Sequence, residues 1–111
     1  MIVKFTSPEE FCQEIEKDAN AKAIGRGIVR CTIRHATSRL SPMILHVDAI
    51  ATYSVGGQII KLDHYCGDIW QLNTDDDKKV FDKAKACLSS VEEKCKALDL
   101  QVRSGILEEG Y

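Results

Sequence analysis

The dipeptide Gly56-Gly57 joins two stretches of alternating apolar and polar residues, and it constrains the fold more than any other feature of the chain. Two-residue turns of this composition adopt the type I′ or II′ geometry that β-hairpins prefer. Residues 43–66 therefore predict a hairpin with a defined register. The predicted pairs on one of its faces are Val55 with Gln58, Tyr53 with Ile60, Ala51 with Leu62, Ala49 with His64 and Val47 with Cys66.

The alternation gives the two faces of this hairpin different characters. Successive side chains of a strand point to opposite sides of a sheet. The face that carries the pairs named above is mostly apolar, so we expect it to be buried. The opposite face mixes charged and apolar side chains, namely Ile44, His46, Asp48, Ile50, Thr52, Ser54, Ile59, Lys61, Asp63 and Tyr65.

Two helices are predicted from their start signals and apolar spacing. Ser7 and Glu10 form a capping box, and Pro8 suits the first helical position. Thr74 caps a longer helix, in which apolar residues between 80 and 98 recur every three or four positions. Three further segments alternate as strands do, namely 2–6, 28–36 and 100–106.

The predicted order is strand, helix, three strands, helix, strand. This order predicts an α+β fold over a single domain, residues 1–111: a two-layer sandwich with a mixed, mostly antiparallel five-stranded sheet. Right-handed crossovers place both helices on one face when the strands lie side by side in chain order. Ala49 and Ala51 would let the helices approach the central strand closely.

The composition narrows the class of protein. The chain has 111 residues, a formal charge of -2 and 44% hydrophobic residues, and its apolar runs are only a few residues long. We therefore expect a globular, cytoplasmic protein with no membrane span and no signal peptide.

The five cysteines include no Cys-x-x-Cys pair and are expected to be reduced and buried. Cys31, His35, His64 and Cys66 share the predicted inner face. However, Cys31 and Cys66 flank the central strand and lie about 9.6 Å apart, too far to bind one zinc ion. We expect neither a metal nor a cofactor.

One alternative is an enzyme. The order helix, three strands, helix, strand resembles the core of the PD-(D/E)xK nucleases, which place an acidic residue and Glu-x-Lys on their hairpin to bind magnesium and activate water. The resemblance implies a metal-dependent site formed by Asp48, Asp63 and Lys61. The chain departs from the pattern at Ile59, which stands where the glutamate is expected.

The leading hypothesis is a small non-enzymatic interaction or regulatory module. The outer face of the predicted sheet combines apolar anchors with a charged rim, as protein interfaces do. We expect a homodimer through this face, with another protein or an anionic molecule as the alternative partner. Nucleic acid is not expected, because Tyr65 is the one aromatic residue available for stacking bases. If there is no partner, the Arg and Lys stems simply cover the isoleucines. The predicted contact residues are Arg30, Arg34, Ile50, Ile59, Lys61 and Tyr65.

Overall fold

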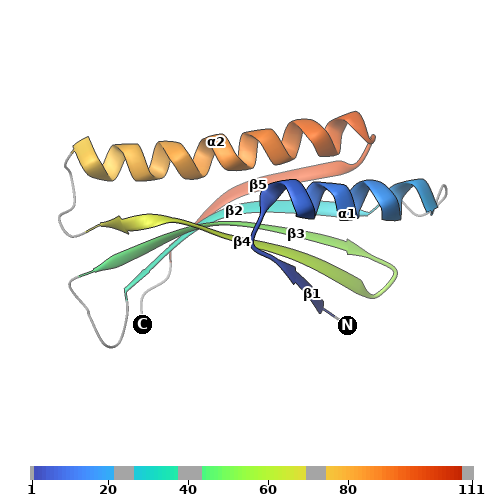
Figure 1. Cartoon of the computed structure of the whole chain (residues 1–111), viewed down its shortest axis with the longest axis horizontal. Coiled ribbons are helices and arrows are strands. Elements are labelled where there is room, and N and C mark those ends of the chain that lie inside the picture. Colours follow the sequence, from blue (N-terminus) through green and yellow to red (C-terminus); the bar gives the residue numbers. More distant parts are fainter. Residues whose placement is uncertain (1, 22–26, 38–43, 70–74, 109–111) are drawn as a thin grey trace.

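The computed structural model describes residues 2–21, 27–37, 44–69 and 75–108. The helices and strands follow the predicted order (Figure 1). They are β1 (Ile2–Phe5), α1 (Pro8–Ala21), β2 (Ile28–Thr37), β3 (Leu45–Val55), β4 (Gln58–Ile69), α2 (Asp75–Ala97) and β5 (Gln101–Glu108). Within these described residues, neither helix is both long enough and apolar enough to cross a membrane.

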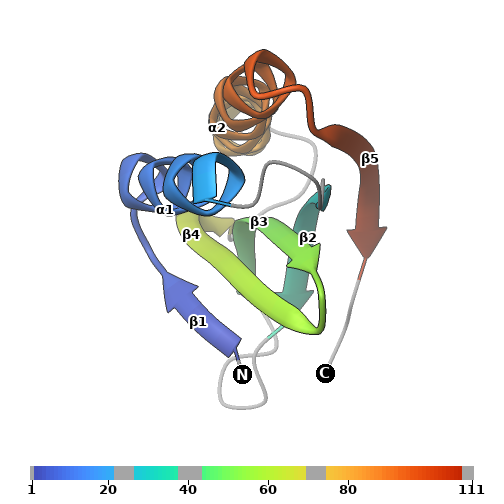
Figure 2. The ribbon, with the colours of Figure 1, turned by 90° about the vertical axis from the view of Figure 1, so that its right-hand side faces the viewer.

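Both helices pack on the same face of a mixed five-stranded sheet, so the predicted α+β class is confirmed (Figure 2). The predicted strand order is wrong. The sheet has the order β1-β4-β3-β2-β5, in which β1 runs parallel to β4 and β5 runs parallel to β2. Each helical connection therefore passes over two strands. Both connections cross the sheet in the same direction between parallel strands, so one handedness places both helices on one face.

This order covers the middle of the sheet better than the predicted order would. In chain order, each helix would lie over one pair of edge strands, and the central strand would be covered only at the seam between the helices. In the observed order, α2 contacts β2, β3, β4 and β5, while α1 packs against β1, β4 and α2. Ala49 and Ala51 of β3 are completely buried under this layer. Their small side chains allow the close approach of α2 that the sequence predicts.

The N-terminus of α1 has the predicted cap, with one change of partner. The backbone N–H of Glu10 donates to Ser7 Oγ at 3.4 Å. The Ser7 hydroxyl in turn donates to the carboxylate of Glu9 at 2.9 Å.

The hairpin has the predicted turn and, for most of its length, the predicted register. Gly56 and Gly57 have φ angles of 54° and 81°, as a type I′ turn requires. Val55 pairs with Gln58, and the register holds as far as Ala49 and His64.

The last predicted pair, Val47 with Cys66, is wrong because β4 contains a bulge. Val47 pairs with Gly67, whereas Asp48 pairs with Tyr65, so Cys66 is an extra residue on β4. Gly67 has a φ of 150°, a conformation that favours glycine. The extra residue turns Asp68 onto the face that the helices leave uncovered.

Candidate functional site

The candidate site is the face of the sheet opposite the helices, called the outer face below. Strand pairing arranges its side chains in rows that run across the sheet. One row contains a basic residue from each of four strands, with Thr52 of β3 between them. These four residues, called the basic band, are Lys4, Lys61, Arg30 and Arg103.

The basic band has no neutralising partners in the part of the chain described. Lys4, Arg30 and Arg103 are exposed, and Lys61 is half-buried. The ion pairs on the outer face are instead made by Arg34 and His46. Four cations in one row therefore face solvent together.

Apolar side chains lie on both sides of the basic band. Ile2 pairs with Ile59 in the next row, and Ile50 lies on the other side of the band. Ile59 and Ile50 are half-buried, whereas Ile2 is 60% exposed and Tyr65 is 52% exposed. All six predicted contact residues, Arg30, Arg34, Ile50, Ile59, Lys61 and Tyr65, thus lie on the outer face.

Arg34 connects two carboxylates of the outer face. Its Nη2 donates to Asp48 Oδ2 at 2.7 Å and lies 3.6 Å from Asp63 Oδ2. The structure thus brings Asp48 and Asp63 to the same guanidinium. Lys61, the third residue of the nuclease-like set, lies in the basic band, and no ion pair joins it to these carboxylates in the described chain.

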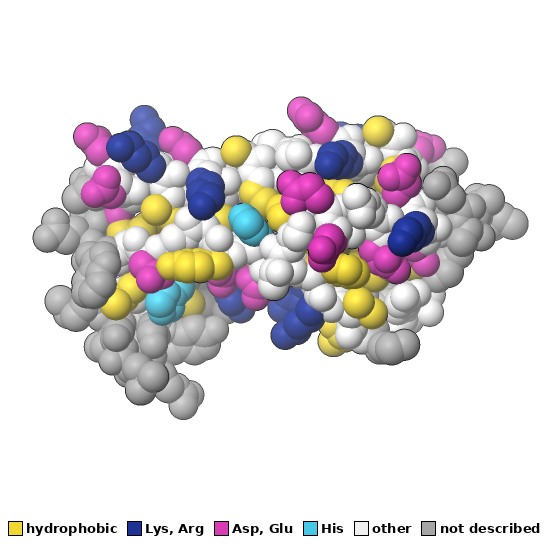
Figure 3. All heavy atoms as spheres, in the orientation of Figure 1, with side chains coloured by type: hydrophobic (Ala, Val, Ile, Leu, Met, Phe, Trp, Pro, Cys, Tyr) yellow, Lys and Arg dark blue, Asp and Glu magenta, His cyan; other side chains and the backbone are white. Residues whose placement is uncertain are grey.

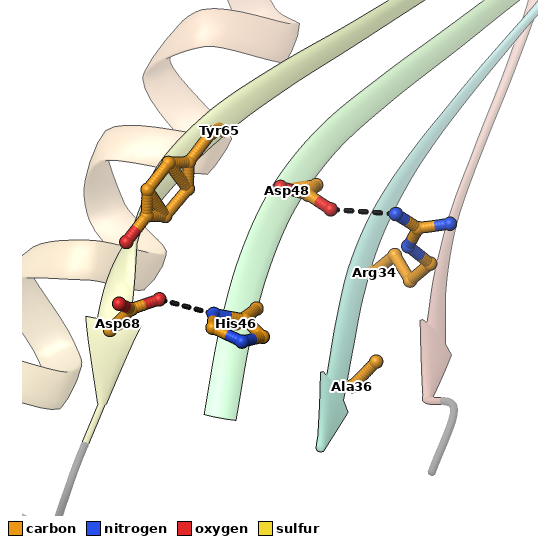
Figure 4. Close-up of a pocket in the computed structure, with 6 residues that line it drawn as sticks. All are labelled: Arg34, Ala36, His46, Asp48, Tyr65 and Asp68. Carbon is orange, nitrogen blue, oxygen red and sulfur yellow. Dashed lines mark hydrogen bonds and ion pairs between the residues drawn. The ribbon is translucent and has the colours of Figure 1, made fainter. Parts of the chain in front are cut away.

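A second cluster, formed by His46, Tyr65 and Asp68, lies beyond the arginine (Figure 4). His46 Nδ1 donates to Asp68 Oδ1, and the His46 and Tyr65 rings meet edge to face with centroids 6.5 Å apart. The hydrogen bond to Asp68, with some desolvation, raises the pKa of Tyr65 to about 12. The same hydrogen bond, assisted by His46, lowers the pKa of the Asp68 carboxyl.

Sequence reasoning missed the role of Asp68, because the predicted strand ends at Cys66. The bulge extends β4 to Ile69 and places Asp68 opposite His46. The available signal was Gly67, since a lone glycine within a strand pattern is typical of a bulge.

The two clusters border an open pocket of about 410 Å³. Its lining combines carboxylates, one guanidinium and two aromatic rings, so it offers hydrogen-bond acceptors to a cationic group more readily than to an anion. The lining residues are Arg34, Ala36, His46, Asp48, Tyr65 and Asp68.

The predicted inner-face histidines have structural partners. His64 Nδ1 donates to the carbonyl of Thr6 at 3.0 Å, which ties β4 to the end of β1. The His35 ring meets Phe81 of α2 edge to face, with centroids 5.7 Å apart. Within the described residues, no three His, Cys, Asp or Glu side chains are placed to hold a metal ion.

The view in Figure 3 shows acidic and basic side chains interspersed over the helices and the adjoining sheet, so no large area of this surface carries charges of one sign alone.

Comparisons with protein-family models, curated proteins and solved structures found no match to this chain. Function is therefore inferred from the geometry and chemistry of the outer face.

Proposed function

We propose that this protein is a non-enzymatic interaction or regulatory module that self-associates through the outer face of its sheet. One observation carries the proposal. Both helices cover the same face of the sheet, and the two exposed large hydrophobic side chains of the described chain, Ile2 and Tyr65, lie on the other face. Ile2 adjoins Ile59 in the same row, and contiguous apolar patches rimmed by polar residues are typical of protein-interaction sites.

The outer face carries partly exposed apolar side chains among its charged ones. Ile50 and Ile59 are half-buried and lie on opposite sides of the basic band, and Tyr65 lies diagonally across from Ile50 with more than half of its surface exposed. Asp63 pairs with Ile50, and Asp48 pairs with Tyr65. A non-obligate interface is about as apolar as the rest of a protein surface, so this mixture of apolar and charged side chains is compatible with one.

The size of the face indicates a reversible association. Five strands at a spacing of about 4.8 Å give a width of about 19 Å, and the eight residue steps from His46 to Ser54 give a length of roughly 27 Å. The resulting area of roughly 500 Å² per partner is below the approximately 800 Å² of a standard interface. We therefore expect a dimer whose population rises with concentration.

The alternative, a metal-dependent nuclease-like enzyme, draws on the proximity of Asp48 and Asp63. A cation already lies beside both carboxylates, since Arg34 Nη2 is 2.7 Å from Asp48 and 3.6 Å from Asp63. A metal ion would have to compete with this guanidinium. The interaction module is therefore the better-supported function.

The test is the double variant Ile50→Glu with Ile59→Glu. Two new charges on the outer face should raise the dimer dissociation constant by roughly 100-fold or more, because a desolvated unpaired charge costs several kcal/mol. Neither side chain points into the core, so we expect an unchanged thermal melt. The measurement is sedimentation velocity over a concentration series.

The matched control is Ala86→Glu with Ser90→Glu, which adds the same charge to the exposed side of α2. This variant should self-associate as the wild type does. A wild-type protein that stays monomeric at every concentration would contradict the proposal. So would a control variant that loses association while the Ile50/Ile59 variant keeps it.

A further inference from the structure

The charges of the outer face are separated along the strands. The basic band crosses the sheet at the level of Lys61, and the carboxylates of Asp63, Asp48 and Asp68 lie progressively further along. Lys61 and Asp63 are two residues apart on β4 and point to the same side, so their Cα atoms are separated by about 6.8 Å. One end of the face is thus basic, and the other end carries three carboxylates with one guanidinium, that of Arg34, so carboxylates are in excess there.

Only some symmetric dimers bring the basic end of one copy against the carboxylates of the other. In a two-fold interface, residue i of one copy meets residue j of the other, and j meets i. Two sheets that pack face to face with their strands nearly aligned require an axis lying between them, either close to the strand direction or close to its perpendicular. The charges of the outer face discriminate between these placements.

Two simple placements oppose like charges. An axis along β3 would exchange β4 with β2 and bring Lys61 against the partner's Arg30. An axis across the strands at the level of Ile50 would bring Asp63 against the partner's Asp63, because these two residues are paired in one row. Like charges opposed across an interface cost several kcal/mol.

A third placement opposes unlike charges. An axis across the strands, midway between the Lys61 row and the Asp63 row, brings Lys61 against the partner's Asp63 twice in each dimer. It also brings Ile59 opposite the partner's Tyr65, so the exposed aromatic ring meets an apolar residue. Packed sheets lie about 10 Å apart, and their strands cross at about 30°. This crossing angle displaces facing residues near the two-fold axis less than those far from it.

We infer that the partner of the outer face is a second copy docked in this third arrangement, with Lys61 of each protomer paired with the partner's Asp63. The inference rests on the proposed self-association and specifies its register. Each protomer then completes the acidic end of the other's outer face with a cation from its own basic band.

The test uses two single variants, Lys61→Asp and Asp63→Lys. Alone, each variant opposes like charges twice per dimer, so its dissociation constant should rise by roughly tenfold or more. Mixed in equal amounts, they oppose unlike charges at both contacts, and a heterodimer should form with an affinity within about threefold of the wild type. Sedimentation with one variant fluorescently labelled measures both results.

A matched control is Arg103→Asp, which makes the same charge change within the basic band but on β5, three strands away from this contact. It should change the dissociation constant by less than about threefold. Asp63→Lys also removes one partner of Arg34, so a thermal melt must show that it folds. The chain carrying both exchanges, Lys61→Asp with Asp63→Lys, is a second test and should associate as the wild type does.

The outcomes separate the register from the proposed function. A monomeric wild type would overturn both. If the wild type dimerises and Ile50→Glu with Ile59→Glu abolishes dimerisation, the proposed function holds. If under those conditions neither the mixed variants nor the double exchange restores affinity, the register is wrong.

Discussion

At the scale of single residues, the hydrogen bond between Tyr65 and Asp68 should be visible by titration. The ionised Asp68 carboxylate accepts a hydrogen bond from the Tyr65 hydroxyl, so it favours the neutral phenol and raises the pKa of Tyr65 to about 12. Replacing Asp68 with Asn removes the negative charge. We therefore expect the Tyr65 pKa to fall towards the ordinary value of 10.0.

Absorbance of the phenolate measures this shift. The chain contains three tyrosines, so the Tyr65→Phe variant is subtracted to isolate one titration. An unchanged Tyr65 titration in Asp68→Asn would show that the hydrogen bond is not formed. The same interactions lower the pKa of Asp68 in the folded protein below its unfolded value of 3.8. Ionised Asp68 therefore stabilises the folded state fully above pH 3.8, and this stabilisation is lost as the pH falls through the folded-state pKa.

At the scale of secondary-structure elements, the start of β2 depends on a close approach that only glycine permits. A Cβ at Gly27 would lie 2.2 Å from the Tyr53 ring, which is completely buried. The Tyr53 hydroxyl donates to Asp18 at 2.8 Å and ties β3 to α1. Gly27→Ala must displace this ring, so we expect a loss of about 1–3 kcal/mol in the free energy of unfolding.

Urea denaturation measures this loss in the free energy of unfolding, and the same substitution in a Tyr53→Leu chain is the control. In a Tyr53→Leu chain the ring is absent, so Gly27→Ala should cost clearly less there. Equal costs in the two backgrounds would show that the contact with Tyr53 is not the cause.

The elements also show what the sequence could predict. Hairpin pairing from Val55 to Ala49 follows from local alternation and a Gly-Gly turn, and it is confirmed. The pairing beyond Asp48 was wrong because one bulged residue shifts every later side chain to the opposite face. That shift hid the cluster of Asp68 with His46.

The strand order was wrong for a different physical reason. Handedness restricts each crossover but does not say how many strands it passes over. The choice depends on how the helices cover Ala49 and Ala51, which is a property of the folded sheet rather than of any local segment. Likewise, the alternation predicted which side chains share the outer face, but Arg34 binding both Asp48 and Asp63 required the strand register and side-chain geometry.

At the scale of the whole molecule, the fold has two unlike sides. One side of the sheet carries a layer of two helices and the buried core, and in the described chain the other side carries the basic band, the carboxylates and the exposed Ile2 and Tyr65. A two-layer fold of this kind leaves a broad face available for a partner. Isoleucine side chains lie on both sides of the sheet, so their methyl resonances can show which side contacts a partner.

The most direct test of the account is to follow isoleucine methyl resonances while the wild-type protein is diluted. We predict that methyl shifts move with concentration on the outer face, at Ile2, Ile28, Ile50 and Ile59. Inner-face and core methyls should stay fixed, at Ile15, Ile33, Ile60 and Ile69. Shifts confined to the inner set, or no concentration dependence in either set, would contradict the claim that the outer face of the sheet is where this protein makes its contacts.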